Sequence, residues 1–449
     1  MLRRKFTETL LEWKNTPGKN CLLVKGARQV GKTFIIDDFA KKNYKNYVYI
    51  NFELSKNRRD IFDGDLDIDS LIIRLSANYR NVKLESGNTI IFLDEIQSCP
   101  NARVALKSFS MDGRFDVIAS GSLLGLNYKE VSSYPVGYET PVELHPLDFE
   151  EFLWAMGIGE DVIAYVSDAV RNKKKLDDSV MKRMDEYYVF YASVGGMPAV
   201  VNKFVGTNDF SEVYAAQKGI VDEYMNDVSK YAAGSEKPKI KNVFRSIPAQ
   251  LAKDNKKFQY SRIYGYEQGE GTRTYSNSLL WLHDANIVSF CHNLQEPSAP
   301  LASNVIPDSF KVYMRDTGLL MSMLEEGVLV SFLKGDVKVN KGGIAENLTA
   351  DVLTKKGIPL TYFEKRGILE TDFVVNTDGT VTALEVKSGN NKRSKSLSSV
   401  ISRHGVERGI KLERTNIHVD AESIEHYPLF AAAFLFPPVD LKVPPRRPV

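Results

Sequence analysis

The chain has 449 residues, which is too long for one ordinary hydrophobic core, and at roughly 100–200 residues per domain we expect two to four domains. Its 43% hydrophobic and 26% charged residues exclude wholesale disorder, a collagen-like repeat and a small disulfide scaffold. Lys and Arg total 59 against 57 Asp and Glu, so any contact with nucleic acid must come from local patches rather than from a global field.

The cysteines and the hydropathy of the chain indicate its cellular compartment. The three cysteines, Cys21, Cys99 and Cys291, are widely spaced without a metal-ligand rhythm, which favours a reducing environment. No window reaches the roughly 18 uncharged apolar residues that a membrane-spanning helix needs. The basic first residues are not followed by the apolar stretch of a secretion signal. We therefore expect a cytoplasmic protein with no membrane partner.

Short β-branched or aromatic runs alternate with helical stretches through residues 1–150. This alternation is typical of an α/β domain in which a parallel sheet is covered by helices. The expected strands are Cys21–Lys25, Tyr47–Phe52, Thr89–Leu93, Phe115–Ala119 and Pro141–Leu144.

The rest of the chain divides into three expected parts. Residues 151–235 are helical with long charged faces and are expected to form a helical lid. Residues 236–305 look like a small helical module that closes with a pair of strands. In residues 306–449 strands return, mixed with helices, which predicts a second α/β domain.

The strongest motif is Gly26-Ala27-Arg28-Gln29-Val30-Gly31-Lys32-Thr33, a full match to G-x-x-x-x-G-K-[ST]. It follows an apolar strand and precedes a helical stretch, which is where a phosphate-binding loop has to lie. Its glycines let backbone N–H groups turn inward around phosphate oxygens, and the helix N-terminus adds partial positive charge. Lys32 is expected to reach the β- and γ-phosphates, and the Thr33 hydroxyl to bind Mg²⁺. The motif therefore predicts binding of ATP with Mg²⁺.

An apolar run, Ile90–Leu93, ends in two carboxylates, Asp94 and Glu95. A run buried on both faces is typical of a central parallel strand, and its C-terminal end lies at the edge of the sheet where ligands bind. Asp94 is expected to hold Mg²⁺ through water, and Glu95 to activate the attacking water as general base. The pair supports hydrolysis of ATP in addition to binding.

Small hydroxyl residues end the next expected strand, at Ser120 and Ser122. Either hydroxyl could orient the attacking water or contact the γ-phosphate. An ordinary polar strand end with a tight turn explains the same residues equally well.

These motifs resemble those of the AAA+-type "ATP-binding protein" family of bacteria and archaea, which pairs an AAA_14 ATPase domain with a C-terminal DUF4143 domain. The likeness spans nearly the whole chain. It is carried by Gly26–Thr33, Leu93–Gln97, Ser120–Leu124, Pro146–Leu153, Gly195–Pro198, Lys311–Leu319 and Glu385–Gly389. The resemblance implies an N-terminal ATPase domain and a C-terminal domain similar to restriction-endonuclease folds.

The chain departs from this family at one point. Many relatives carry an arginine beside the glycine at Gly137-Tyr138, and this chain has none there. Arg28, Arg103 and Arg114 are then the candidates for an in-cis phosphate contact, although the interpretation as an ordinary surface or packing arginine is favoured for each. Because AAA+-type sites are often completed by an arginine of a neighbouring subunit, a homo-oligomer is one open alternative, and the sequence does not determine the oligomeric state.

The middle of the chain reads as a winged helix-turn-helix between Phe258 and Phe290. In that interpretation Arg273, Tyr275, Ser276 and Asn277 face a DNA groove. The alternative is a purely structural winged helix packed against the ATPase domain, and the shortage of basic residues on the expected reading helix favours it.

A second constellation of charged residues lies near the C-terminus: Glu346, Asp372, Glu385 and Lys387. Strand alternation puts Glu385 and Lys387 on one face, and a hairpin turn at 376–379 brings Asp372 beside them. Converging carboxylates could bind Mg²⁺, with the lysine positioning the attacking water. The pattern resembles the D…E-x-K core of restriction-endonuclease-like nucleases, and a basic run downstream could follow a phosphate backbone. An active nuclease, a non-cutting nucleic-acid binder and a purely structural domain all stay open.

Three functions follow from these readings. The first is an Mg²⁺-dependent ATPase coupled to an action on nucleic acid. The second is a nucleotide-gated switch or adaptor with a non-catalytic C-terminal domain. The third is a metal-dependent DNA nuclease in which ATP is only structural.

Overall fold

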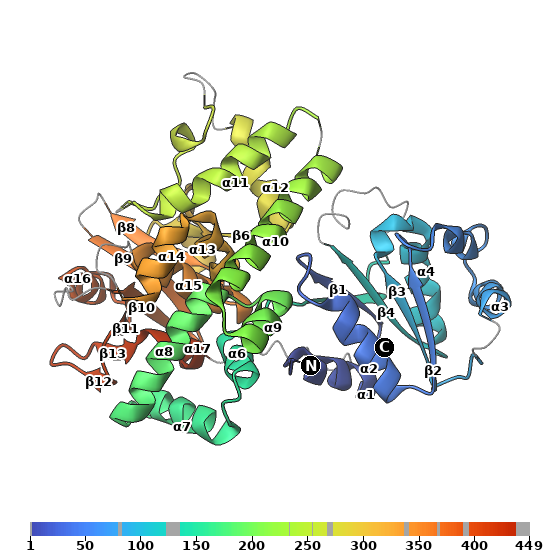
Figure 1. The fold of residues 1–449 in the computed structure, drawn as a ribbon, viewed down its shortest axis with the longest axis horizontal. Coiled ribbons are helices and arrows are strands. Elements are labelled where there is room, and N and C mark those ends of the chain that lie inside the picture. Colours follow the sequence, from blue (N-terminus) through green and yellow to red (C-terminus); the bar gives the residue numbers. More distant parts are fainter. Residues whose placement is uncertain are drawn as a thin grey trace.

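The computed structural model describes residues 2–79, 83–122, 135–232, 234–253, 255–266, 273–335, 341–365, 369–388 and 395–436. It contains two β-sheets, and Figure 1 shows them on opposite sides of the molecule, one in the N-terminal half and one in the C-terminal half. The α/β class expected from the sequence is confirmed. Among the described residues, no helix has the length and apolar character needed to cross a membrane.

The N-terminal sheet has five parallel strands in the order β2-β3-β4-β1-β5. Its strands are β1 (Cys21–Gly26), β2 (Asn46–Asn51), β3 (Thr89–Asp94), β4 (Asp116–Ser122) and β5 (Glu139–Glu143). Each agrees with an expected strand to within a few residues. The C-terminal ends of β1, β3 and β4 meet at one edge, so the order brings the phosphate-binding motif and the carboxylate pair together.

Helices cover both faces of this sheet, because alternate strand residues point to opposite sides. Leu22 and Val24 pack with α1 (Phe6–Asn15) and α2 (Lys32–Asn43). Leu23 packs on the other side with α3 (Ile68–Asn78) and α4 (Pro100–Asp112). The result is a three-layer P-loop domain, as the sequence predicted.

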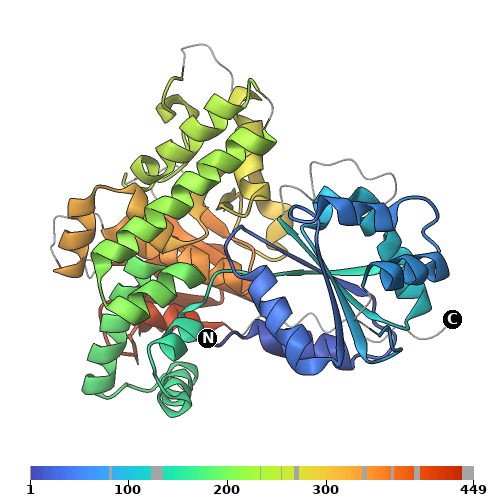
Figure 2. The same ribbon diagram turned by 45° about the vertical axis from the view of Figure 1, so that its right-hand side comes forward.

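A helical region follows the first domain. It begins at α6, where Asp148 and Glu151 form a capping box that fixes the first turn. Its helices are α6 (Phe149–Ala155), α7 (Glu160–Arg171), α8 (Asp178–Val194), α9 (Pro198–Thr207), α10 (Phe210–Tyr231), α11 (Lys237–Leu251) and α12 (Arg273–Asp284). Figure 2 shows the long helix α10 running along the C-terminal half of the molecule.

The second sheet is mixed and has eight strands in the order β12-β13-β11-β10-β9-β8-β6-β7. They are β6 (Val288–Leu294), β7 (Val305–Met314), β8 (Thr361–Lys365), β9 (Leu369–Thr377), β10 (Thr380–Val386), β11 (Arg408–Glu413), β12 (His418–Val419) and β13 (Glu425–Pro428). Its helices are α13 (Thr317–Met323), α14 (Glu326–Leu333), α15 (Lys341–Lys355), α16 (Lys395–His404) and α17 (Ala432–Leu435). Short 3₁₀ helices lie at Lys56–Phe62, Ile96–Ser98, Tyr260–Arg262, Leu301–Asn304 and Leu429–Ala431.

One expected boundary needs correction. The division between residues 305 and 306 falls after the first residue of β7, and β7 pairs with β6 along the whole of β6. Strand β6 also pairs with β8 of the C-terminal part. The strand pair expected to close the central module is therefore part of the C-terminal sheet, since β6 is hydrogen-bonded to β8. The other expected boundaries stay predictions.

Close contacts join the helical region to the C-terminal sheet. Asp316 caps α13 by accepting from the Leu319 N–H at 2.9 Å, and its other oxygen accepts from the Gly196 N–H at 2.7 Å. A Cβ built on Gly318 would lie 2.4 Å from the Val194 carbonyl oxygen, so only glycine permits this approach. These contacts explain why two glycine-containing motifs far apart in sequence occur together.

Candidate nucleotide-binding site

The phosphate-binding motif forms the turn from β1 into α2. A Cβ on Gly26 would lie 2.4 Å from the Leu144 carbonyl oxygen, so the start of the loop requires glycine on steric grounds. Gly31 has φ 92°, a left-handed conformation that side chains disfavour, and it directly precedes the first turn of α2. The loop therefore has the backbone that the motif predicts.

Lys32 is folded back onto its own loop. Its ammonium group donates to the Gly26 and Ala27 carbonyl oxygens, each at 2.9 Å, and the side chain is buried. Burial lowers the pKa of Lys32 to about 8, although the nearby Glu95 and Asp94 carboxylates oppose this shift. The lysine is thus held at the centre of the loop by acceptors that a phosphate would replace.

Asp94 ends β3 and is almost completely buried, at 1% exposure. Its Oδ2 accepts from the Thr33 hydroxyl at 3.0 Å, and Oδ1 accepts from the Ser120 hydroxyl. The structure therefore brings Thr33, Asp94 and Ser120 together. Ser120 contacts the carboxylate. A role of Ser120 toward water or phosphate stays a prediction, as does the alternative of an ordinary polar strand end.

Two further side chains, which the motifs did not reveal, donate hydrogen bonds to Asp94. The Tyr49 hydroxyl donates to Asp94 Oδ2 at 3.0 Å, and the Asn51 amide donates to the same oxygen at 2.9 Å. Both lie on β2, which neighbours β3 in the sheet. The sequence did contain one signal that could have identified them: strand alternation places residues 47, 49 and 51 of the expected strand on one face.

Glu95 follows Asp94 in a left-handed conformation, with φ 54° and ψ 45°. It accepts a hydrogen bond from the Gln97 side-chain amide. Burial and the neighbouring Asp94 raise the pKa of Glu95. A partly buried carboxylate with a raised pKa beside Lys32 has the properties of a general base.

Helix α10 contacts the loop from the second half of the chain. The Arg28 guanidinium pairs with Asp227 at 2.8 Å, and the Gln29 side chain donates to Glu223. One turn away, Lys230 pairs with Glu53 at 2.9 Å. These contacts place Arg28 against α10.

The two other candidate arginines are engaged within the N-terminal domain. Arg103 is buried and pairs with Glu139 at 2.9 Å. Arg114 pairs with Asp112 at 2.7 Å and with Asp69 at 2.8 Å. These pairs fit the structural interpretation of both residues.

A small cavity of about 140 Å³ opens beside the loop. Its walls combine apolar and polar side chains from the N-terminal segment, α2 and α9. They are Leu2, Arg4, Thr7, Gly31, Phe34, Ile35, Pro198 and Asn202.

The second predicted constellation is also brought together. The Lys387 ammonium pairs with Glu385 at 2.9 Å, and the Val386 N–H donates to Asp372 at 2.7 Å. Glu346 is buried and pairs with Lys256 at 2.8 Å. Burial and Asp372 raise the pKa of Glu346. The second carboxylate oxygen of Glu385, Oε2, is buried without a hydrogen-bond partner.

This constellation is not a preformed metal centre. Within the described part of the chain, no three carboxylate, imidazole or thiolate groups converge closely enough to hold a metal ion. Glu346 and Glu385 each have a lysine partner instead. The sequence missed Lys256 and Lys311, the second of which is buried beside Glu346 and Asp372 and pairs with Glu370 at 3.0 Å.

The residues expected to face DNA lie on α12. Tyr275 is buried at 3% exposure and packs against the Tyr266 ring, so its expected outward position is wrong. Asn277 is exposed and Ser276 is partly exposed. The side chain of Arg273 lies outside what the structure describes. Tyr275 belongs to the core because the apolar stripe of α12 includes it.

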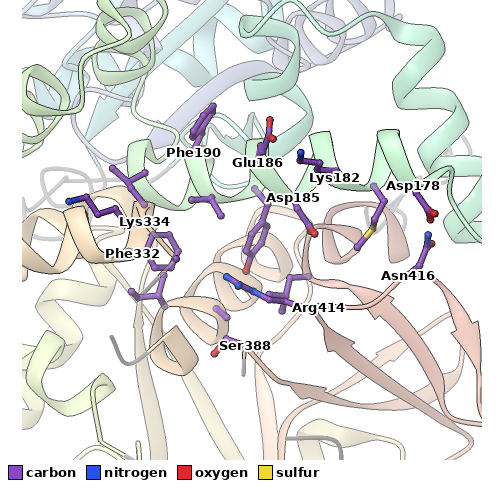
Figure 3. Close-up of a pocket in the computed structure, with 18 residues that line it drawn as sticks. Asp178, Lys182, Asp185, Glu186, Phe190, Phe332, Lys334, Ser388, Arg414 and Asn416 are labelled. Atoms are coloured by element: carbon purple, nitrogen blue, oxygen red, sulfur yellow. The ribbon is translucent and has the colours of Figure 1, made fainter. Parts of the chain in front are cut away.

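A larger groove of about 560 Å³ lies away from the phosphate-binding loop, between α8 and the C-terminal sheet. Figure 3 shows Asp185 on α8 across from Arg414, with Phe332 and Ser388 on the opposite wall. Burial raises the pKa of Asp185 to about 6, and Arg414 partly opposes the shift. Ser388 directly follows Lys387 in the sequence, so the groove begins next to the second constellation.

Family comparisons agree with this geometry. Residues 18–153 match the AAA domain family AAA_14, and residues 341–429 match the domain of unknown function DUF4143. The two matches together fit the AAA+-type ATP-binding family with a C-terminal DUF4143 domain. Residues 185–328 additionally match the domain of unknown function DUF8612.

The individual relatives are distant in sequence. An uncharacterized protein of Methanocaldococcus jannaschii is 22% identical over 81% of this chain and 74% of its own length. An uncharacterized protein of Haemophilus influenzae is 23% identical over 44% of each chain. A solved Walker-type ATPase of Pyrococcus abyssi is 14% identical with a TM-score of 0.42, over 72% of this chain and 96% of that one.

Proposed function

We propose that the protein is an Mg²⁺-dependent ATPase whose site is formed by the Gly26–Thr33 loop and the Asp94-Glu95 pair. The observation that carries this proposal is the hydrogen bond of 3.0 Å from the Thr33 hydroxyl, at the end of the loop, to Asp94 Oδ2, at the end of β3. A hydroxyl and a carboxylate oxygen are hard ligands of the kind that Mg²⁺ prefers. These two groups therefore fit the cation.

Each residue has a distinct role in this proposal. The loop amides and the Lys32 ammonium bind the phosphates and stabilise charge that develops during transfer. Thr33 and Asp94 hold the cation, which when bound supplies electrostatic stabilisation of phosphate oxygens. Glu95 accepts a proton from the attacking water, and Ser120, Tyr49 and Asn51 keep Asp94 oriented.

The cavity beside Gly31 supports a nucleotide as the ligand. It adjoins the loop, and its lining includes the apolar side chains of Leu2 and Ile35 and the Asn202 amide, which can form hydrogen bonds. We place the base of ATP there, next to the start of α2.

The Glu95→Gln variant tests hydrolysis separately from binding. An amide of the same shape cannot accept the proton, so we expect ATP turnover to fall by at least about 100-fold while nucleotide affinity stays within a few-fold. The measurements are phosphate release and binding of a fluorescent ATP analogue. Lys32→Ala is the comparison variant, in which binding itself should be lost. Wild-type turnover in Glu95→Gln would refute the assignment of the base.

An action on nucleic acid is a second candidate function. It is favoured by the order of elements α11, 3₁₀ helix Tyr260–Arg262, α12, β6 and β7, with an isolated bridge from Lys257 to Lys311 of β7. This order matches a winged helix, in which a short strand pairs with the hairpin. Asn277 and Leu280 are exposed on α12 and would then form the contact surface.

DNA titration separates the three functions. If ATP hydrolysis is coupled to nucleic acid, DNA should stimulate turnover, and Asn277→Ala should reduce that stimulation. If the protein is a switch or adaptor, turnover should be slow and indifferent to DNA. If it is a nuclease with a structural ATP site, it should cut DNA equally well with Lys32→Ala and lose cutting with Lys387→Ala.

A further inference from the structure

The segment that precedes α1 reaches the phosphate-binding loop through Arg4. The Arg4 guanidinium donates to the Val30 carbonyl oxygen of the loop at 3.2 Å and to the His145 carbonyl oxygen, just after β5, at 2.6 Å. The Arg4 side chain is only 9% exposed. Because β5 neighbours β1 on the side away from β4 and β3, Arg4 approaches the loop from the side opposite Asp94.

A carboxylate of α6 holds this guanidinium in place. Arg4 Nε donates to Glu151 Oε1 at 3.1 Å, and the same oxygen accepts from the Lys5 N–H at 2.7 Å. The second oxygen of Glu151 accepts from the Asp148 N–H at 3.0 Å, within the capping box of α6. Hydrogen bonds between ionised groups are strong and geometrically specific. Arg4 therefore connects the loop to the first turn of the helical region.

The carbonyl that Arg4 holds belongs to the peptide unit between Val30 and Gly31. In a planar trans peptide the C=O and the N–H point in opposite directions, so fixing the Val30 carbonyl also fixes the direction of the Gly31 N–H. Gly31 lacks a Cβ and has φ 92°, so side-chain sterics do not restrain the backbone at this point. Backbone N–H groups are the phosphate ligands that a loop of this type provides. Arg4 thus sets the direction of one such N–H group.

We propose that Arg4 is a positioning residue of the nucleotide site, which orients the Val30–Gly31 peptide for phosphate binding. This inference rests on the proposed function, in which the loop binds ATP. The guanidinium directs its nitrogens toward Val30, His145 and Glu151, so it acts on phosphate through the loop. A preorganised loop favours the bound substrate and the transition state alike. Loss of Arg4 should therefore raise KM for ATP and change kcat little.

Steady-state ATP hydrolysis by the full chain tests the proposal with Arg4→Met, which keeps an unbranched apolar side chain but removes its donors. We expect KM to rise at least about tenfold while kcat stays within about threefold of wild type. Arg4→Lys retains a charged donor and should recover part of the affinity. Arg3→Met is the matched control and should keep the wild-type KM. Arg3 lies in the same segment, but it pairs with Glu160 of α7 and stacks over the Trp154 ring of α6.

Inorganic tripolyphosphate with Mg²⁺ shows whether Arg4 acts through the loop. This probe has the phosphates of ATP but no base, and its affinity is measured by competition with the fluorescent ATP analogue. If Arg4 positions the loop, Arg4→Met should weaken binding of tripolyphosphate and of ATP by the same factor. Arg4 also lines the cavity beside Gly31. A loss confined to ATP would therefore assign Arg4 to the base instead and overturn the proposal.

The other outcomes separate this proposal from the function on which it rests. A wild-type KM in Arg4→Met overturns the positioning role while ATP hydrolysis itself stands. A lower kcat at unchanged KM also overturns it, since Arg4 would then act only in the transition state. If Arg4→Met does not fold, Glu151→Gln replaces it, because it removes the charge that holds Arg4; a wild-type KM there overturns the proposal. If Lys32→Ala binds ATP as well as wild type does, the proposed function fails as well.

Discussion

Arg28 of the phosphate-binding loop pairs with Asp227 of α10 at 2.8 Å, with Asp227 only 9% exposed. This contact joins the loop that would hold the triphosphate to a helix of the second half of the chain. The carboxylates of Asp227 and Glu223 already contact Arg28 and Gln29 of this loop. A bound triphosphate would add negative charge to the same loop. Nucleotide binding should therefore weaken the attachment of α10, and α10 packs on both α11 and α13.

The Arg28–Asp227 pair makes a prediction about stability. Burial raises the pKa of Asp227 to about 6, even though Arg28 opposes the shift. A raised pKa in the folded state means that this group stabilises the fold at low pH and that the contribution is lost as pH rises through about 6. At pH 7.5 the ionised Asp227 carboxylate therefore lowers the free energy of unfolding. We expect Asp227→Asn to unfold at the same temperature as wild type or higher, with the difference shrinking at pH 5.

Removing the arginine should have the opposite effect. Arg28→Ala leaves a buried carboxylate without its cation, and we expect the unfolding midpoint at pH 7.5 to fall by about 2 °C. The double variant should recover this loss. Asp222→Asn is the matched control, since Asp222 is exposed on the same helix. Equal losses in Asp227→Asn and Arg28→Ala, measured by calorimetry, would contradict the argument.

Lys32 predicts how ATP affinity depends on pH. Burial lowers its pKa to about 8 in the nucleotide-free protein, and only the ammonium form binds phosphate well. Above this pKa, binding must take up a proton. Affinity should therefore fall about tenfold between pH 7 and pH 9. The Lys32→Arg variant keeps its charge over this range and should show a flat profile in the same fluorescence titration. A flat profile in wild type would mean that Lys32 stays protonated throughout.

The Thr33 hydroxyl is predicted to act through the cation. Thr33→Val keeps the shape of the side chain but removes the oxygen that lies 3.0 Å from Asp94. We expect ATP affinity in the presence of Mg²⁺ to fall by at least about tenfold, and affinity in EDTA to be nearly unchanged. Thr33→Ser retains the oxygen and serves as the control. An equal loss with and without Mg²⁺ would show that the hydroxyl has a different role.

Local sequence patterns were sufficient to predict the strands of the N-terminal sheet. The expected strands lie close to those observed because parallel strands buried on both faces read as apolar runs, and Ile90–Leu93 is such a run. The loop and the carboxylate pair were predictable for the same reason, because each follows directly on a strand. Their meeting at one sheet edge required only the rule that the carboxyl ends of parallel strands coincide.

Contacts between distant segments were not predictable. Nothing near Asp227 in sequence marks it as the partner of Arg28, and nothing near Lys256 points to Glu346. Tyr275 was expected on the surface because polar neighbours surround it in sequence, but the helix turns its ring toward Tyr266. A domain boundary was expected between residues 305 and 306 because the prolines nearby resemble a linker, but β6 and β7 pair across it. Only the tertiary structure supplies these relationships.

Two helical glycines provide a final prediction about how the halves of the chain are joined. A Cβ on Gly318 of α13 would lie 2.4 Å from the Val194 carbonyl and 2.5 Å from the Gly195 nitrogen, both backbone atoms that cannot rotate away. Gly318→Ala should therefore destabilise the protein by ~2 kcal/mol, by forcing α13 away from the end of α8. Gly327 of α14 has no atom within 4 Å of such a Cβ, so Gly327→Ala should be neutral or stabilising by up to ~1 kcal/mol through helix propensity. Chemical denaturation of the two variants measures both effects, and opposite signs are expected. If Gly318→Ala is as stable as Gly327→Ala, the close approach of α13 to residues 194–195 does not contribute to holding the C-terminal half in place.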